Sequence, residues 1–250
     1  MLKKRIIPIV LLDGFSVLKT IKFDERRNLG SPITILRTYN TRNVDELILL
    51  DIDASRDNRS IDVFTVQEVA SECFMPLTVG GGLKTSDDIA LALSKGADKV
   101  SLNSGALDNS QLIKEASRFF GSQSIVVSID VANENGQYFI FKNGRIFKEI
   151  ELVDWCKESC SLGAGELLIN SVDRDGTMSG GDLILADKIS CLVDIPVIYA
   201  GGISGPGNCA ELGTTNVSAL GIASIFHFTS ITPRDCKLEM NRHKISVRLN

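Results

Sequence analysis

Residues 77–82 read Leu-Thr-Val-Gly-Gly-Gly, and residues 197–202, which lie 120 positions later, read Val-Ile-Tyr-Ala-Gly-Gly. Each stretch is a short apolar run that ends in paired glycines, which is typical of a buried strand followed by a tight turn. Ser104 recurs as Ser224 at the same offset of 120 residues. The chain is therefore predicted to consist of two halves that are built alike.

Eight short apolar runs recur along the whole chain, and longer amphipathic stretches such as 60–73, 86–95, 110–119 and 152–162 separate them. Strands that are apolar on both faces are typical of a parallel sheet covered by helices. Eight strand–helix units in 250 residues predict an α/β protein, a (β/α)8 TIM barrel with a two-fold half-barrel repeat. The alternative, an open doubly wound sheet, is disfavoured by the repeat. The eight runs are Ile6–Leu12, Glu46–Asp51, Leu77–Val79, Lys99–Leu102, Ser124–Asp130, Glu166–Asn170, Val197–Ala200 and Ala219–Gly221.

Composition and charge narrow the class of protein further. A hydrophobic content of 44% with no linker or low-complexity tract predicts one domain over residues 1–250. The net charge of -4 argues against general affinity for nucleic acid or for an anionic membrane. The apolar run near the N-terminus ends at Asp13, which is too short for a membrane span. We therefore expect a cytoplasmic protein.

The cysteines give no sign of a metal or a disulfide framework. Six cysteines are scattered without a Cys-x-x-Cys pair, and the chain has only two histidines. This pattern predicts reduced thiols in a reducing compartment. Cys156 and Cys160 could in principle hold a metal, but no further thiol or imidazole ligand lies near them in the sequence. We expect neither a metal nor another cofactor.

One segment departs from the strand–helix alternation. Between residues 133 and 146, Asn-Glu-Asn-Gly and Lys-Asn-Gly turns flank the run Gln137–Lys142. This pattern predicts a β-hairpin inserted after the fifth barrel strand. Because loops that follow barrel strands lie on the catalytic face, the insertion is a candidate lid.

Glycines and hydroxyl residues follow the third, fourth, seventh and eighth predicted strands. Glycine at a strand end lets backbone N–H groups approach a phosphate closely, and the next helix contributes its positive N-terminus. Four such turns, paired by half, predict two anion sites across one barrel mouth, and hence a ligand with a phosphate at each end. The alternative is that these glycines serve tight turns only. The candidate phosphate-binding residues are Gly81, Gly82, Asn103, Ser104, Asp175, Gly176, Thr177, Gly201, Gly202, Ala223 and Ser224.

Asp130 ends the fifth predicted strand and is the candidate catalytic residue. A carboxylate at this end of a barrel strand can act as a general acid or base, although it can also cap a turn. By the 120-residue offset Asp130 should have a partner near position 10, where the chain reads Ile9-Val10-Leu11-Leu12. Two matching halves should offer two facing carboxylates, and this chain offers one. His227 is expected to pack in a helix.

Four charged residues open predicted strands at the opposite end of the barrel. Because side chains alternate along a strand, Lys99 shares its face with Ser101 and Asn103, and that face points inward if Asn103 contacts a ligand. Two cations and two anions would then meet on the barrel axis, where charges are rare unless paired. The alternatives are solvated charges at strand starts and a neutral salt-bridge ring that plugs or gates the barrel. The four residues are Arg5, Glu46, Lys99 and Glu166.

These residues resemble the cyclase subunit of imidazole glycerol phosphate synthase over essentially the whole chain. The most specific runs are Lys4-Arg5-Ile6-Ile7, Thr78-Val79-Gly80-Gly81-Gly82, Gly96-Ala97-Asp98-Lys99-Val100-Ser101, Phe120-Gly121-Ser122-Gln123 and Ser171-Val172-Asp173-Arg174-Asp175-Gly176-Thr177. The resemblance implies a partner glutaminase on the N-terminal face of the barrel. It also implies an ammonia gate at the four charged residues, and ammonia transfer through the barrel to a phosphate-bearing nucleotide intermediate, which two aspartates process by lyase and cyclase chemistry.

The first of those two aspartates is missing here. Counted by side-chain parity from Arg5, the inward positions are Ile7, Ile9 and Leu11, so Leu11 takes the place of the acid, or Val10 if the register slips by one. Neither can transfer a proton, and Asp13 in the following turn is the one nearby substitute. Losing one member of an acid/base pair commonly costs ~10²–10⁴ in rate.

A chain that keeps the gate and phosphate residues but lacks the first aspartate resembles the paralogous cyclase-like subunit that is associated with amidation of surface sugars. There a glutaminase and the barrel feed ammonia to a sugar amidotransferase. One alternative is an authentic cyclase subunit of histidine biosynthesis with an unusual first strand. Another is a non-catalytic scaffold that binds the glutaminase. Whether the chain is an enzyme is left open by the missing aspartate.

Overall fold

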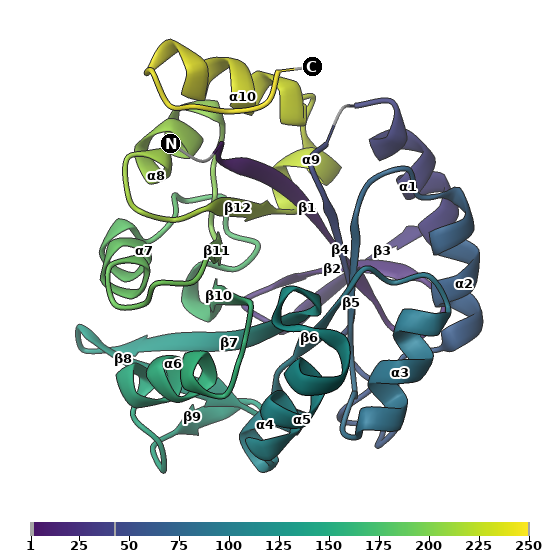
Figure 1. Cartoon of the computed structure of the whole chain (residues 1–250). Helices are drawn as coiled ribbons and strands as arrows, with labels where there is room; N and C mark the ends of the chain where they lie inside the picture. The colour runs from purple at the N-terminus through teal and green to yellow at the C-terminus, as the bar shows by residue number, and fades with distance from the viewer. Residues whose placement is uncertain (1–2, 43, 250) are drawn as a thin grey trace.

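A computed structural model describes residues 3–42 and 44–249 (Figure 1). Eight strands pair in parallel, each with the next, and the last pairs with the first, so the sheet closes into a barrel with helices around it. The predicted (β/α)8 fold is confirmed. The barrel strands, in order around the cycle, are β1 (Arg5–Leu12), β4 (Leu47–Asp51), β5 (Leu77–Gly80), β6 (Lys99–Leu102), β7 (Ile125–Glu134), β10 (Glu166–Ser171), β11 (Val197–Ala200) and β12 (Ala219–Ile222).

The helices that cover the barrel begin with recognisable caps. Thr85 and Asp88 form a capping box at the start of α3, and Thr232 and Asp235 form one at α10. Two short 3-10 turns, Ser122–Ser124 and Val172–Arg174, follow α5 and β10. The helices are α1 (Pro32–Asn40), α2 (Val63–Glu72), α3 (Ser86–Ser94), α4 (Ser104–Asp108), α5 (Gln111–Phe120), α6 (Leu152–Ser161), α7 (Leu183–Ser190), α8 (Pro206–Gly213), α9 (Ser224–Phe228) and α10 (Pro233–Arg242).

Alternation along the strands separates two apolar clusters. On β1, Ile6, Val10 and Leu12 belong to the large cluster between strands and helices, whereas Ile7 and Ile9 belong to a smaller cluster inside the barrel, against which Leu11 packs. The inward register predicted from Arg5 is therefore the observed one, and Val10 points toward the helices.

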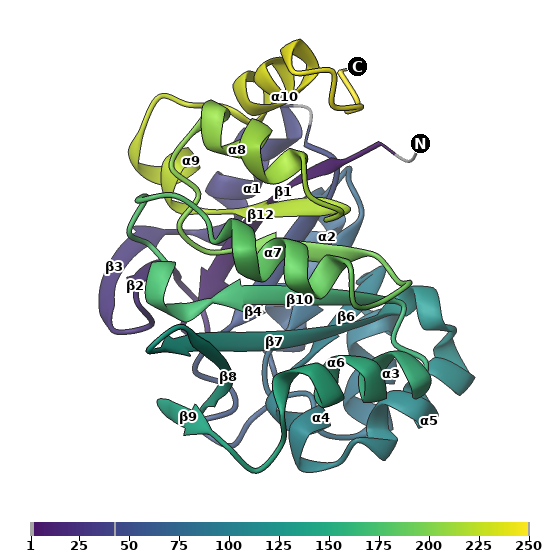
Figure 2. The ribbon, with the colours of Figure 1, turned by 90° about the vertical axis from the view of Figure 1, so that its left-hand side faces the viewer.

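Two β extensions project from the end of the barrel at which the strands finish (Figure 2). The first is a hairpin of β2 (Val17–Ile21) and β3 (Glu25–Gly30), which pairs with the end of β1. The second is the predicted insertion, in which β7 continues to Glu134 and pairs with β8 (Gln137–Lys142), and β8 pairs with β9 (Arg145–Phe147). The second extension is confirmed, with one more strand than expected, while the first is absent from the sequence-based prediction.

The two-fold repeat is visible in the backbone. Gly81 and Gly201 both have positive φ, and a Cβ on either would lie 2.6 Å from a carbonyl oxygen of the preceding strand in the cycle, Asp51 or Ser171. Those two carbonyls are themselves 120 positions apart in the chain.

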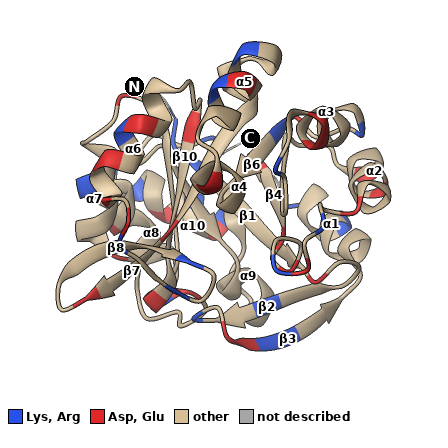
Figure 3. Cartoon of the chain, turned by 90° about the horizontal axis from the view of Figure 1, so that it is seen from below, with Lys and Arg blue, Asp and Glu red and all other residues tan. Residues whose placement is uncertain are grey.

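No helix among the described residues is long and apolar enough to cross a membrane. In the ribbon view of Figure 3, acidic and basic residues are interspersed along the chain rather than separated by sign.

Candidate functional site

A cavity of about 720 Å³ opens at the barrel mouth where the two β extensions lie. Residues from all eight barrel strands, or from the loops directly after them, line it. The expected phosphate residues are part of this lining except Thr177, whose hydroxyl donates to the carbonyl of Arg174 instead. The structure thus brings the two glycine turns and the predicted catalytic aspartate into one pocket.

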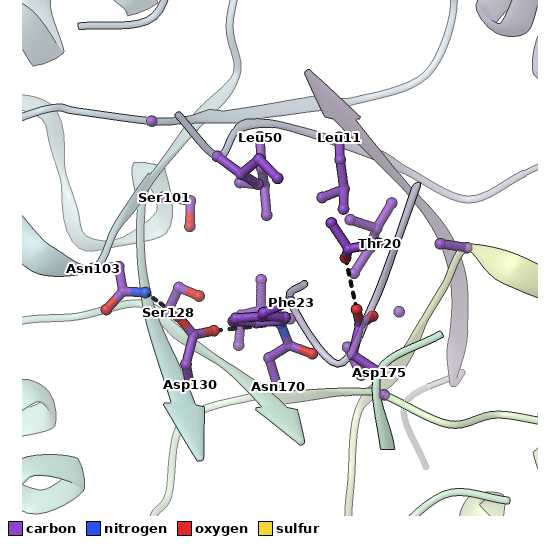
Figure 4. Close-up of a pocket in the computed structure, with 18 of the residues that line it drawn as sticks. Leu11, Thr20, Phe23, Leu50, Ser101, Asn103, Ser128, Asp130, Asn170 and Asp175 are labelled. Atoms are coloured by element: carbon purple, nitrogen blue, oxygen red, sulfur yellow. Dashed lines mark hydrogen bonds between the residues drawn. The ribbon is translucent and has the colours of Figure 1, made fainter. Parts of the chain in front are cut away.

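Asp130 lies on one side of this pocket, held by two amides. The Nδ2 atoms of Asn103 and Asn170 donate to its two carboxylate oxygens at 2.8 and 3.3 Å (Figure 4). Burial raises the pKa of Asp130 to about 6, and the charge of Asp175 adds to this, while both amide hydrogen bonds act to lower it. A carboxyl group with such a pKa can both take up and release a proton near neutral pH.

The wall across from Asp130 is apolar. Leu11 on β1 and Leu50 on β4 line the pocket opposite Asp130 and its two amides (Figure 4). β1 and β7 are four strands apart in a cycle of eight, so they face each other across the axis. Asp13 is exposed, accepts a hydrogen bond from the Ser16 amide, and is not part of the pocket lining. The pocket therefore holds no carboxylate on β1 to pair with Asp130.

A buried lysine enters the pocket from β2. Lys19 is 3% exposed, and its Nζ lies 2.7 Å from Asp175 Oδ1, while the Thr20 hydroxyl donates to Asp175 Oδ2 at 2.7 Å. The negative charge of Asp175 is thus balanced by Lys19 of this hairpin. Sequence reasoning missed Lys19 because it missed the hairpin, although the run Val17–Ile21, with its β-branched Val, Thr and Ile, could have indicated a strand.

The first hairpin also fixes an arginine at the rim. The guanidinium of Arg26 on β3 forms a bidentate pair with Asp53 at 2.5 and 2.6 Å, and Arg56 joins the same carboxylate. The hydrogen bond and the charge of Arg26 lower the pKa of Asp53, so this carboxylate remains ionised.

The glycine turns place backbone at the edge of the cavity. Gly82 and Gly202 have φ of +66° and +78°, and an added Cβ would lie 1.9 Å from the Arg59 carbonyl or 2.6 Å from the Gly180 carbonyl. A side chain at either position would therefore displace the neighbouring backbone. Ser104 and Ser224 begin the short helices α4 and α9 beside these turns.

Two further carboxylates near strand ends, Asp51 and Asp173, are engaged structurally. Asp51 is buried, forms an ion pair with Arg59 at 2.5 Å, and accepts hydrogen bonds from the amides of Asp53 and Ala54. Asp173 accepts a hydrogen bond from the Asn133 amide at the second extension.

His227 lies in α9, as expected, and its ring packs against Tyr39. Burial lowers its pKa to about 4, so the ring is neutral at pH 7. The described residues contain no cluster of three or more His, Cys, Asp or Glu side chains suited to a metal ion.

The four charged residues at the opposite end of the barrel form a closed set of ion pairs, which we call the charged ring. Lys99 Nζ lies 3.1 Å from Glu46 and 3.2 Å from Glu166, and Arg5 pairs with the same two carboxylates. Burial alone would lower the pKa of Arg5, but its hydrogen bonds and the charges of Glu166 and Glu46 raise it above its usual value. Each charge therefore faces two charges of opposite sign.

An apolar layer separates the charged ring from the pocket. On β1 and β4, Ile7 and Ile48 follow the ring residues Arg5 and Glu46 and are fully buried. Further inward residues of this layer are Val126, Ile198 and Ala219. The barrel axis is thus closed by aliphatic side chains between a charged end and a polar pocket.

The fold and the pocket define a (β/α)8-barrel protein with a polar pocket at the C-terminal ends of its strands and a ring of ion pairs at the other end. A family model described as "Histidine biosynthesis protein" matches residues 5–232. The chain therefore belongs to this family, and within it to the HisF-type cyclase subunits of imidazole glycerol phosphate synthase.

Two curated relatives match along their entire length. A protein of Campylobacter jejuni, provisionally named imidazole glycerol phosphate synthase subunit hisF2, is 45% identical over 249 residues, which is 100% of both chains. The imidazole glycerol phosphate synthase subunit HisF of Streptococcus mutans is 42% identical over 252 residues, with 99% of this chain and 100% of the relative covered.

Proposed function

We propose that this barrel takes up ammonia from a glutaminase docked on its N-terminal face and delivers it at the C-terminal mouth for amidation of a surface sugar. Imidazole formation is not its main reaction. The observation that carries this choice is Leu11, which occupies the pocket wall where the family's first catalytic aspartate is expected. A single carboxylate, Asp130, remains on the facing strand β7.

The charged ring supports the ammonia route. Two cations and two anions cancel one another, so the ring can be stable without solvent while it closes the axis. Behind it, Ile7 and Ile48 offer no partner for a charge. A small neutral molecule such as ammonia crosses an apolar layer at far lower cost than an ion does. We therefore assign the charged ring the role of an ammonia gate.

Exposed aromatic rings support a docking partner at this end. Phe74 after α2 and Phe119 near the end of α5 are 84% and 70% exposed. Both lie shortly before a barrel strand begins, so both belong to the face that holds the charged ring. Large apolar side chains that water covers in the free protein favour a protein partner.

The pocket supports a phosphate-bearing ligand. Gly82 with Ser104, and Gly202 with Ser224, repeat the same turn geometry on two sides of the cavity. Backbone N–H groups beside the start of a helix bind anions without a basic surface. We propose that both positions bind phosphate groups, and that the ammonia acceptor is a separate amidotransferase.

The alternative is an authentic cyclase of histidine biosynthesis. It is favoured by the retained phosphate turns and by Asp130, whose pKa of about 6 suits proton transfer. In this alternative, one carboxyl group must carry out the acid/base catalysis for which the family uses two aspartates.

The test combines the barrel with its cognate glutaminase. We expect a stable complex in sedimentation and a glutamine hydrolysis rate that rises on complex formation. With the ribulosyl nucleotide and glutamine, the same complex should form little or no imidazole product. Absence of both complex and stimulation would contradict the proposal, and cyclase turnover at the level of a family member that has both aspartates would establish the alternative.

A further inference from the structure

Among the described residues, no positively charged side chain forms an ion pair with the Asp130 carboxylate. Its two hydrogen-bond donors are neutral amides, and none of the ion pairs among residues 3–42 and 44–249 includes it. Two lysines line the same pocket, and they pair with other carboxylates, Lys19 with Asp175 and Lys142 with Asp108. Asp130 is half-buried and lines the pocket, so its charge is open to a cation bound there.

Two serine hydroxyls beside Asp130 also lack partners. Ser101 and Ser128 are 5% and 6% exposed, and both line the pocket. Ser128 precedes Asp130 by two residues on β7 and Ser101 precedes Asn103 by two on β6, so all four side chains share the inward face. Neither hydroxyl makes a hydrogen bond to any described residue, and both line the pocket, so both can accept a hydrogen bond from a bound ligand.

The acceptor atoms in this part of the pocket therefore lie on one side. The lone pairs of Asp130, the two serine oxygens and the Oδ1 atom of Asn103 are available on β6 and β7, because Asn103 uses its Nδ2 atom to hold Asp130. Across from them lie Leu11 and Leu50 (Figure 4). A ligand bound here is offered the charge of Asp130 and several neutral acceptors, while Asp175, whose charge also reaches Asp130, is paired with Lys19.

We propose that Asp130, Ser101 and Ser128 form a binding site for an ammonium ion at the floor of the pocket, on the pocket side of the apolar layer. The choice of ammonium rather than another cation rests on the function proposed above, in which ammonia arrives along the axis and takes up a proton from solvent water in the pocket. Ammonium has four N–H donors and one positive charge, which match a carboxylate and three neutral oxygens from two adjacent strands. A divalent metal ion is disfavoured, because it prefers six or more oxygens with several carboxylates among them.

The first test is a titration of the isolated barrel followed by amide NMR. Ammonium chloride is compared with potassium chloride and tetramethylammonium chloride at constant ionic strength and pH 7.5. We expect saturable shifts at residues 101–103 and 128–130 with ammonium at concentrations where the other two cations cause none. Tetramethylammonium has the same charge as ammonium but no N–H donors. Potassium also has this charge, but it forms no directional hydrogen bonds.

Two variants and one control define the site. Asp130→Asn keeps the side-chain shape and removes the charge, and should weaken ammonium binding at least tenfold, since hydrogen bonds to a charged group are the strong ones. Ser128→Ala should weaken it several-fold. Asp24→Asn, in an exposed turn of the first hairpin, should bind like the parent.

Equal shifts with potassium, or unchanged binding by Asp130→Asn, would overturn the ammonium site. This outcome is separable from the proposed function, because the titration needs neither glutaminase nor nucleotide. If the barrel couples to glutaminase but does not bind ammonium in the titration, the proposed function stands and the ammonium site is contradicted. If the barrel binds ammonium but not glutaminase, the ammonium site stands and the proposed function is contradicted.

Discussion

The ring of Phe23, in the turn between β2 and β3, meets the ring of Phe141 on β8 edge to face, with the centroids 6.2 Å apart. Both rings line the pocket, so the two β extensions touch across its opening. The contact joins segments that are far apart in sequence, and it constrains how the mouth opens.

We predict that Phe141→Ala loosens the first hairpin as well as the second. An aromatic pair contributes ~0.5–1.5 kcal/mol beyond its buried area, and the hairpin has few other contacts with the second extension. Hydrogen exchange of the β2 and β3 amides should therefore accelerate about two- to tenfold. Phe139→Ala is the matched control, because its ring lies under Lys148 and not over the pocket. Equal acceleration in both variants would contradict a role for the contact.

Leu11→Asp should restore measurable cyclase activity with ammonium salt and the ribulosyl nucleotide, because it returns a carboxyl group to the wall opposite Asp130. The parent is expected to be ~10²–10⁴-fold slower than a family member with both acids. Leu11→Asn is the control, since it has the shape of aspartate and cannot transfer a proton at neutral pH. Imidazole product is measured with each variant, and equal activity of the two would show that the carboxyl group is not the missing part.

Lys99→Ala should uncouple the proposed complex. Its removal leaves two carboxylates, Glu46 and Glu166, with Arg5 as the one remaining cation of the charged ring, so the ring no longer closes as a neutral set. Glutamine hydrolysis should continue while a smaller share of the ammonia reaches the C-terminal mouth and more escapes to solvent, as measured by the ratio of glutamate formed to free ammonia released. Lys157→Ala, on the exposed side of α6, should leave this ratio unchanged.

The stability of the protein should respond to the charge on Asp130 in a definite direction. Its pKa is about 6 in the folded protein and ~3.9 in an unfolded chain. Between these values the folded state binds a proton that the unfolded state lacks, so this group's contribution to stability falls as pH rises through that window. Above pH ~6, Asp130→Asn should therefore be more stable than the parent, by at most ~3 kcal/mol.

Urea unfolding of both proteins between pH ~4 and ~8 measures this difference. The gap should shrink as pH falls and become small near pH ~4, where Asp130 is protonated in the folded state and about half protonated in the unfolded state. A gap that does not change with pH would show that the carboxylate is not destabilised by its surroundings. Asp175, whose charge contributes to the shift, is present in both proteins.

Crystals grown in phosphate should show two anions, one near Gly82 and Ser104 and one near Gly202 and Ser224. The repeated backbone geometry predicts similar occupancy at the two positions. Ser224→Ala should reduce the second anion and leave the first unchanged. Well-ordered turns without an anion at high phosphate concentration would count against both sites.

The barrel was predictable because its strands are continuous apolar runs, and the two turns of the second extension were predictable for a local reason. Asn135 with Gly136, and Asn143 with Gly144, have positive φ, and Asn-Gly is the pair that adopts this conformation most readily. The turn of the first hairpin needs the same conformation but uses Lys22 and Phe23, with φ of 52° and 64°. Nothing in these two residue types indicates such a turn, so β2 and β3 were missed.

Part of the candidate site was also predictable from the sequence. Strand-end residues such as Asp130 and Asn103 were identified because a parallel barrel gathers all strand ends at one mouth. The alternation of inward and outward side chains along the first strand also predicted that Leu11 lies in the pocket. Lys19 comes from the hairpin that the sequence did not reveal. Its pairing with Asp175, 156 positions away, depends on tertiary structure alone.

The closed barrel has no free strand edge, but its two extensions do, since β3 pairs with β2 alone and β9 with β8 alone among the described residues. Unpaired edges can recruit strands from other molecules and so promote aggregation. β3 is almost fully exposed and reads Glu-Arg-Arg-Asn-Leu-Gly, with three consecutive charges. Such charges oppose edge-to-edge pairing, so replacing Glu25 and Arg27 with β-branched residues would lower the solubility of the protein before it lowers the stability of the fold.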